Sequence, residues 1–153
     1  MHYWLLHIIL VLCSFIKPGT SFTSNNHPDK KHHEHVVLVV SSKDIKETEL
    51  NKNEILDIYT LKKQNWSNGT RIRVVDFKGN NHLRSTFYDY LDIRIPSIKR
   101  IWLKEQFTGK SLPPIIVKEV EDMLKIIRET PGTIGYIPAD SLTSDLKVLE
   151  RIE

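Results

Sequence analysis

Short apolar runs alternate with amphipathic stretches along most of this chain. Four runs have the apolar, β-branched character of strands: 36–40, 72–77, 133–137 and 147–152. The first three predict buried strands, and the alternating pattern of the last predicts a strand at a sheet edge. Four other stretches place apolar residues at helical spacing: 52–61, 81–91, 97–108 and 118–129. These stretches predict helices that each pack one face on the sheet.

Local signals mark where several of these elements begin and end. Asn51 and Glu54 have the spacing of a capping box, and Leu50 and Ile55 have the spacing of a hydrophobic staple. Asn68-Gly69 predicts a turn before the second strand. Asn81 and Ser97 are predicted to cap the second and third helices. The helix that starts at Ser97 is expected to end at Gly109.

The order of elements predicts an α/β fold, because strands and helices alternate. With 153 residues, the chain has enough apolar surface for one core. We therefore expect a single three-layer domain with a mainly parallel sheet over residues 36–153. Residues 110–114 are expected to form a loop, and Gly135, inside a strand, predicts close approach by a neighbouring backbone.

The first residues have the pattern of an export signal. Residues 1–15 are apolar, and small residues follow at Gly19 and Ser21, which predicts a signal peptide over 1–21 with cleavage before Phe22. An uncleaved anchor is the alternative, but the apolar run is shorter than the 20 or so residues of a membrane span. Lipid attachment at Cys13 is disfavoured by Leu12. After cleavage the chain would have no cysteine and no membrane span.

Residues 22–35 form a polar tail that contains four histidines: His27, His32, His33 and His35. Imidazoles and carboxylates are suitable ligands for zinc, copper or nickel, so metal capture is one interpretation. We favour a solvated tail, because the segment has no cysteine and no predicted scaffold. The sequence therefore predicts no metal site and no cofactor.

The junction between the second strand and the second helix is the candidate binding site. Free amides and the helix dipole make a helix N-terminus a natural site for anions. The candidate ligand-binding residues are Gly79, Asn80, Asn81, Arg84 and Ser85. Arg84 and Ser85, in the first turn, are expected to add donors. The alternative is that Gly79 and the asparagines are only a turn and a cap.

Charge and motifs exclude several classes of function. The formal net charge is +3, and basic residues are interspersed with acidic ones, so a nucleic acid partner is not predicted. The chain has no nucleophilic serine flanked by glycines, no zinc-protease helix and no glycine-rich phosphate loop with its lysine. Asp89 and Asp92 are interpreted as solvated acids. We therefore predict no catalytic residues and a protein that is not an enzyme.

Three segments together resemble landmarks of the phosphate-type periplasmic substrate-binding protein family, which has the type II periplasmic binding protein fold. They are the run from Leu50 through Glu54, Asp57-Ile58-Tyr59 and Lys62 to Asn65-Trp66, then Phe107-Thr108-Gly109-Lys110, then Thr130-Pro131-Gly132-Thr133-Ile134-Gly135-Tyr136-Ile137. The resemblance covers residues 36–153. It implies a bacterial, periplasmic or secreted protein related to the phosphate-binding component of ABC transporters.

Two departures limit what the resemblance implies. In the family, a serine-glycine-threonine element at the strand–helix junction holds the phosphate, and this chain has 79–85, GNNHLRS, in that place. Family members close two lobes around the ligand, whereas this chain has residues for one. The expected function is an exported single-lobe solute-binding-like protein that takes phosphate or another small oxyanion. The alternative is a module that binds no ligand and docks on an envelope protein; a homodimer is a further expected form of assembly.

Overall fold

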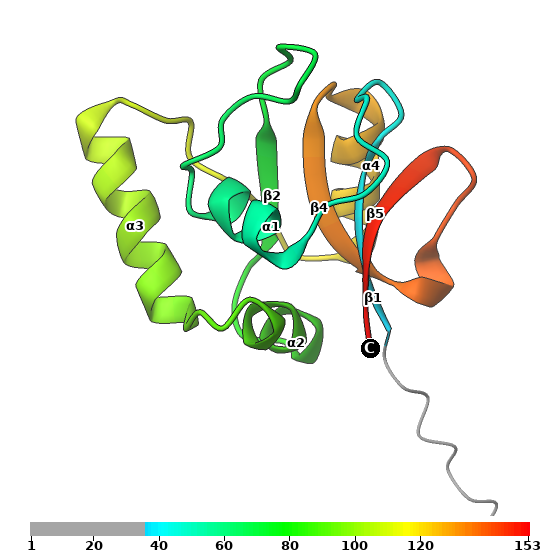
Figure 1. The fold of residues 1–153 in the computed structure, drawn as a ribbon. Helices are drawn as coiled ribbons and strands as arrows, with labels where there is room; N and C mark the ends of the chain where they lie inside the picture. The colour runs from blue at the N-terminus through cyan, green and yellow to red at the C-terminus, as the bar shows by residue number, and fades with distance from the viewer. Residues whose placement is uncertain (1–35) are drawn as a thin grey trace, which may run out of the picture. The chain divides into compact units, whose positions relative to one another are not determined.

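The computed structural model describes residues 36–153, which form a five-stranded sheet in the order β3-β2-β4-β1-β5 (Figure 1). One compact unit, His33–Glu153, contains all of its elements. In chain order these are β1 (Val37–Ser42), α1 (Lys52–Tyr59), β2 (Arg73–Phe77), α2 (His82–Tyr90), α3 (Ile95–Thr108), β3 (Ile115–Val117), α4 (Val120–Glu129), β4 (Thr133–Pro138), the short 3-10 helix η1 (Ala139–Ser141) and β5 (Leu146–Ile152). The predicted signal peptide and histidine tail lie outside the described residues.

Helices cover both faces of the sheet, as the α/β prediction requires. Successive residues of β4 show this, because their side chains point to opposite faces. A side chain at Gly135 would meet Met123 and Ile127 of α4. The next residue, Tyr136, stacks on Phe87 of α2 with ring centroids 4.0 Å apart and also contacts Tyr59 of α1. The three-layer α/β architecture is therefore confirmed (Figure 1).

The prediction of a mainly parallel sheet is only partly correct. Strand β2 pairs in parallel with β3 and β4, whereas β1 pairs antiparallel with β4 and β5. A run of apolar residues indicates that a strand is buried on both faces, but it does not indicate whether the strand pairs parallel or antiparallel with its neighbours. Strand β5 lies at the predicted edge. Strand β3 was not predicted, because a strand of three residues is too short to show a periodic pattern.

Several predicted helix ends are confirmed. Asn51 and Glu54 form both hydrogen bonds of the capping box, and Asn81 caps α2 by accepting from the Arg84 amide at 2.8 Å. Gly109 ends α3 in the left-handed conformation. The predicted cap at Ser97 is wrong: α3 starts at Ile95, because proline is compatible with the first turn of a helix and Pro96 occupies that turn.

The prediction that a neighbouring backbone approaches Gly135 closely is also wrong. A Cβ atom there would lie 2.8 Å from the Met123 sulfur and 3.0 Å from Ile127 Cδ1. Side chains of α4, rather than a neighbouring backbone, therefore fill the space above this glycine. Glycine in the strand lets α4 approach the sheet closely.

Two of the segments that resemble the binding-protein family meet in space. The Trp66 indole is buried and donates a hydrogen bond to the Gly132 carbonyl at 2.9 Å. The Gly132 amide in turn donates to the Asp44 carboxylate at 3.0 Å. Gly132 has φ +73, and a Cβ atom there would lie 2.5 Å from the Arg71 carbonyl oxygen, so glycine is required. These contacts attach the loop before β2 to the start of β4.

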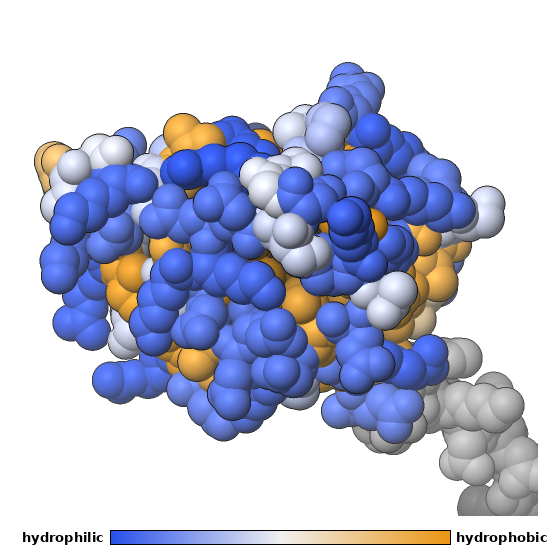
Figure 2. Space-filling view, turned by 45° about the horizontal axis from the view of Figure 1, so that its top comes forward, coloured by the Kyte–Doolittle hydropathy of each residue, from blue (hydrophilic) through white to orange (hydrophobic). Residues whose placement is uncertain are grey.

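The third helix packs on α1 through one side only. Trp102 donates from its indole to the Tyr59 carbonyl at 2.7 Å, and Ile98 is buried beside it. The face of the domain seen in Figure 2 is mainly hydrophilic, with small apolar groups between charged side chains. Trp102 therefore belongs to the core.

We expect Asn51→Ala to lower the free energy of unfolding by about 1 kcal/mol, because the Glu54 amide in the first turn of α1 would lose its side-chain acceptor. Urea denaturation followed by circular dichroism measures the difference. Asn53→Ala is the matched control, since Asn53 is exposed inside α1 and alanine favours helix. Equal losses for the two variants would contradict the role of the cap.

Candidate functional site

An open cleft of about 610 Å³ lies beside the N-terminal end of α2. The β2–α2 loop contributes Gly79 and Asn80, and the first turns of α2 contribute Ser85. Arg94 comes from the residue before α3, and Lys99 comes from α3 itself. Gly79, Asn80 and Ser85 were predicted from the sequence as site residues. The structure therefore brings predicted residues together with two cations that were not predicted.

The loop from Lys78 to Asn81 exposes backbone donors. The Lys78 amide donates to the Val117 carbonyl, and Gly79 then turns the chain with φ +84. Among residues 36–153, no hydrogen bond from the Gly79, Asn80 or Leu83 amides to another residue is found. The α2 dipole adds partial positive charge at the same place. Gly79 and Asn80 line the cleft, so an anion there would find amide donors that no other described residue occupies.

Side chains of the loop hold each other in place. The Ser85 hydroxyl donates to the Asn80 side chain at 3.2 Å, while Asn81 accepts from the Arg84 amide as the cap. Asn81 is exposed, but the oxygen of its side-chain amide already accepts this capping hydrogen bond. Ser85 is half-buried and can rotate its hydroxyl toward the cleft. The asparagines therefore shape the loop, as the turn-and-cap interpretation stated.

Arg84 occupies a different place from the one expected. The sequence suggested that it would donate to a ligand, but its side chain is only 1% exposed. Its guanidinium is paired with Asp76 of β2 at 2.6 Å and also donates to the Gly79 carbonyl. Burial acts to lower the pKa of Arg84, but the charge and hydrogen bond of Asp76 more than offset this, so the pKa is raised. Arg84 thus fixes the loop from inside the domain.

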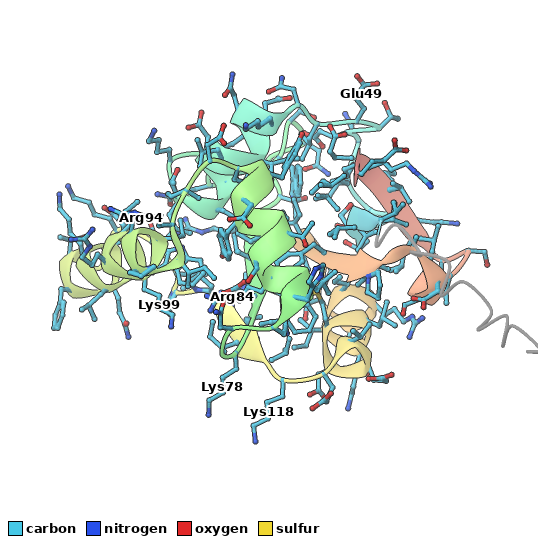
Figure 3. The ribbon with its side chains drawn as sticks, turned by 90° about the horizontal axis from the view of Figure 1, so that it is seen from below. Glu49, Lys78, Arg84, Arg94, Lys99 and Lys118 are labelled. Carbon is cyan, nitrogen blue, oxygen red and sulfur yellow. The ribbon has the colours of Figure 1, made fainter. Side chains whose placement is uncertain are left out.

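The surface around the cleft is positively charged. Arg94 and Lys99 line the cleft, and Lys78 and Lys118 extend from the same side of the domain (Figure 3). None of these four residues forms an ion pair within the described part of the chain. Asp89 is the one carboxylate that lines the cleft. The local field therefore favours an anion.

The sequence analysis did not predict these four basic residues around the cleft, because they come from separate loops and from α3. Lys78 follows β2, Lys118 follows β3, and Arg94 and Lys99 flank the start of α3. No local motif links these residues. The short strand β3 brings Lys118 beside the end of β2, as the pairing of Phe77 with Val117 shows, and that strand was not predicted.

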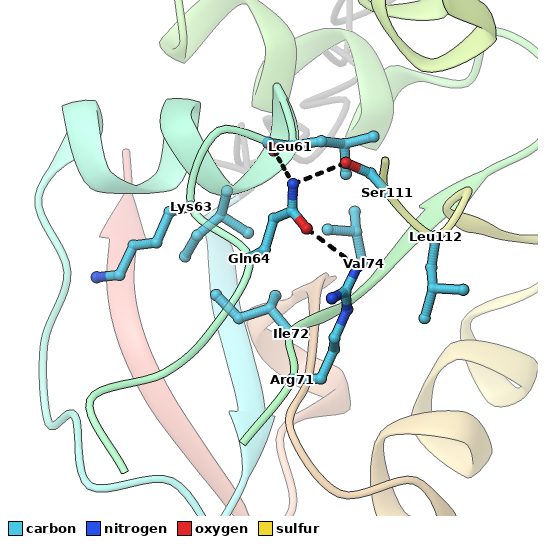
Figure 4. Close-up of a pocket in the computed structure, with 9 residues that line it drawn as sticks. Leu61, Lys63, Gln64, Arg71, Ile72, Val74, Ser111 and Leu112 are labelled. Carbon is cyan, nitrogen blue, oxygen red and sulfur yellow. Dashed lines mark hydrogen bonds between the residues drawn. The ribbon is translucent and has the colours of Figure 1, made fainter. Parts of the chain in front are cut away.

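Two other hollows are poor binding sites. A cavity of about 10 Å³ lies near the end of α1, where Gln64 bonds to Leu61, Ser111 and Arg71 (Figure 4). It has room for about one water molecule. A second, open hollow of about 340 Å³ has Arg128 on its wall, and that side chain is already paired with Asp145 at 2.7 Å. Hydrogen bonds from Thr143 and Arg128 lower the pKa of Asp145 to about 2.

Residues 36–153 contain no cluster of three or more histidine, cysteine or acidic side chains placed to hold a metal ion. The histidine tail lies outside these residues. Among the described helices, none has the length and apolar character needed to cross a membrane.

Comparison with known proteins finds similar solved structures but no matching sequence family. No protein-family model and no curated protein matches the chain. The fold matches a protein of Clostridium perfringens, described as a phosphate ABC transporter substrate-binding protein and solved with bound phosphate, with TM-score 0.61 and 19% identity over 74% of this chain. An ABC-type phosphate transport receptor from Vibrio cholerae matches with TM-score 0.55 and 16% identity over 74% of this chain. PstS from Borrelia burgdorferi matches with TM-score 0.58 and 19% identity over 75%.

The domain has the fold of part of a phosphate-transport binding protein. It spans 44% of the Clostridium protein, 45% of the Vibrio receptor and 46% of the Borrelia protein. These structural neighbours are binding proteins rather than enzymes. At these identities the likeness concerns the fold, and it agrees with the fold that the sequence resemblance implied.

Proposed function

We propose that the protein is a single-lobe, solute-binding-like protein that takes phosphate or another small oxyanion at the N-terminal end of α2. The observation that carries the proposal is that Gly79 and Asn80, whose amides are unoccupied, line one open cleft together with Arg94 and Lys99. The fold shared with phosphate-transport binding proteins supports it. The proposal includes export to the periplasm or cell exterior, on the pattern of residues 1–21, and includes no catalysis.

Each part of the cleft has a distinct role in the proposal. The Gly79, Asn80 and Leu83 amides would donate to the oxyanion, and the Ser85 hydroxyl would add a donor. Arg94 and Lys99 would supply charge from the opposite wall. Arg84 does not touch the ligand in this account. It positions Gly79 through the carbonyl of that residue.

Affinity is expected to be low, because the cleft is open on one side and water competes for each donor. We expect a dissociation constant on the order of 1 mM at low salt, and weaker binding as salt screens the exposed cations. Sulfate and phosphate should bind with similar affinity, since the cleft offers donors and positive charge but few acceptors to recognise a phosphate proton.

Calorimetric titration with phosphate tests the proposal. The chain from Phe22 is suitable, because residues 36–153 contain the whole sheet and its core. We expect Arg94→Ser with Lys99→Ser to weaken binding about tenfold, through loss of two charges near the anion. Lys43→Ser with Lys125→Ser is the matched control, since both lysines are exposed outside the cleft. Heats no larger than the dilution blank at millimolar phosphate would refute the proposal and leave a docking module that binds no ligand.

A further inference from the structure

Helix α3 presents an apolar group to solvent on the side that faces away from the domain. Ile98 and Trp102, four residues apart, are buried against α1 and the core. Leu103 and Phe107, also four residues apart, lie on the opposite side and are 53% and 83% exposed. The helix therefore has two apolar faces, and only one of them is covered within residues 36–153. A small apolar group is visible at the edge of the molecule where α3 lies (Figure 2).

Basic side chains surround this apolar group. Arg100 and Lys104, four residues apart, project from the same outer side of α3, and Lys110 comes after the helix's C-terminal cap, Gly109. All three are exposed, and none forms an ion pair within the described residues. We call Arg100, Leu103, Lys104, Phe107 and Lys110 the outer face of α3. It contains no carboxylate.

The charge of this region differs from the rest of the chain. Residues 93–118 contain six of the 22 basic residues but one of the 19 acidic residues, Glu105. Glu105 is half-buried, on the side of α3 opposite Leu103 and Phe107. Three of the six basic residues, Arg100, Lys104 and Lys110, belong to the outer face of α3, which therefore has positive charge beside its exposed apolar side chains.

An anionic lipid surface fits this combination better than a protein does. A basic helix with a few large apolar side chains binds in the plane of a membrane interface, with the apolar groups in the headgroup boundary. Cations at such a surface are attracted by anionic headgroups. Two exposed apolar side chains are a small fraction of the 20–30 residues that a stable protein interface uses on each side. The partner must therefore present a broad surface of negative charge.

We propose that the outer face of α3 docks the domain on an anionic lipid surface. Phe107 and Leu103 enter the headgroup region, and Arg100, Lys104 and Lys110 contact the anionic headgroups. The contact lies on the surface of the bilayer and uses none of the loop amides of the oxyanion cleft. It therefore stands or falls separately from the proposed solute site.

Co-sedimentation with vesicles tests this proposal. The chain from Phe22 should bind phosphatidylglycerol vesicles and show little binding to phosphatidylcholine vesicles. The triple variant Arg100→Glu, Lys104→Glu, Lys110→Glu should bind phosphatidylglycerol about 100-fold more weakly. The double variant Leu103→Ser, Phe107→Ser should bind about tenfold more weakly.

The control variant has the same change of net charge elsewhere on the domain: Lys43→Glu, Lys46→Glu, Lys125→Glu. These lysines are exposed outside α3, so the variant should bind phosphatidylglycerol within about threefold of the parent. Equal losses for the two triple variants would overturn the proposal, because binding would then follow net charge alone. Absence of vesicle binding, with a dimer in sedimentation analysis that Phe107→Ser abolishes, would overturn it in favour of contact between two copies.

Discussion

Replacing Arg84 with methionine is expected to lower the free energy of unfolding by about 4 kcal/mol. Arg84 and Asp76 are both within 1% of full burial, and their charged groups lie 2.6 Å apart. Removing the guanidinium leaves the Asp76 carboxylate buried with the Tyr136 hydroxyl, at 2.7 Å, as its remaining donor. An uncompensated buried charge is far more costly than a lost surface contact. Chemical denaturation of the purified domain measures the loss.

A matched control separates burial from the chemistry of the substitution. Arg151→Met removes the same group from the pair with Glu153, whose side chains are 58% and 68% exposed, and should cost less than about 1 kcal/mol. Adding Asp76→Asn to Arg84→Met should recover part of the loss, because the unpaired carboxylate is then absent. Equal costs for Arg84→Met and Arg151→Met would show that the buried pair is not important for stability.

Stability is expected to fall steeply above about pH 10, by up to about 4 kcal/mol for each pH unit. Tyr59, Tyr88 and Tyr136 are buried around Phe87, and burial raises the pKa of each phenol well above its usual value near 10. The negative charge of Asp76 raises these pKa values further. Below pH 10 both folded and unfolded chains keep these protons, so stability is complete. Above pH 10 the unfolded chain loses protons that the folded chain keeps, and unfolding becomes favoured.

Urea denaturation at about pH 8 and about pH 11 measures this change, and tyrosinate absorbance follows the ionisation. Tyr88→Phe provides the sharpest control. The Tyr88 hydroxyl is buried near the Asp76 carboxylate and forms no hydrogen bond of standard geometry within the described residues, so its removal should cost little at pH 8. At pH 11 the same variant should lose less stability than the parent, because one titrating group is absent. A parent protein equally stable at both pH values would contradict the burial of these phenols.

Much of the fold could be predicted because local signals and hydrophobic patterns agree. The capping box at Asn51, the cap at Asn81 and the left-handed Gly109 depend on neighbouring residues only, so the sequence specifies them. Strand direction and the three-residue β3 depend on partners elsewhere in the chain. The antiparallel position of β1 between β4 and β5 is of this kind, because a run such as 36–40 is apolar in either direction.

The candidate site was predictable for its loop but not for its charges. Gly79 and the two asparagines identify a strand–helix junction, and the structure has that junction. Arg84 was predicted as a donor to a ligand, whereas its side chain pairs with Asp76 of β2. The sequence of one strand does not show that Asp76 is buried and therefore needs a partner. Arg94, just before α3, and Lys99, within α3, reach the cleft only because the chain places the start of α3 beside α2. The exposed Phe107 resembles a core residue in sequence, because helical spacing alone does not show which of two apolar faces is covered.

The direct test of the central claim is an amide NMR titration of the chain from Phe22 with phosphate. The account predicts that the amides of Gly79, Asn80 and Leu83 shift together and saturate with one dissociation constant on the order of 1 mM, while Gly109, at the far end of α3, does not move. Shifts that spread evenly over exposed lysines without saturation, or no shift at the β2–α2 loop at millimolar phosphate, would contradict it.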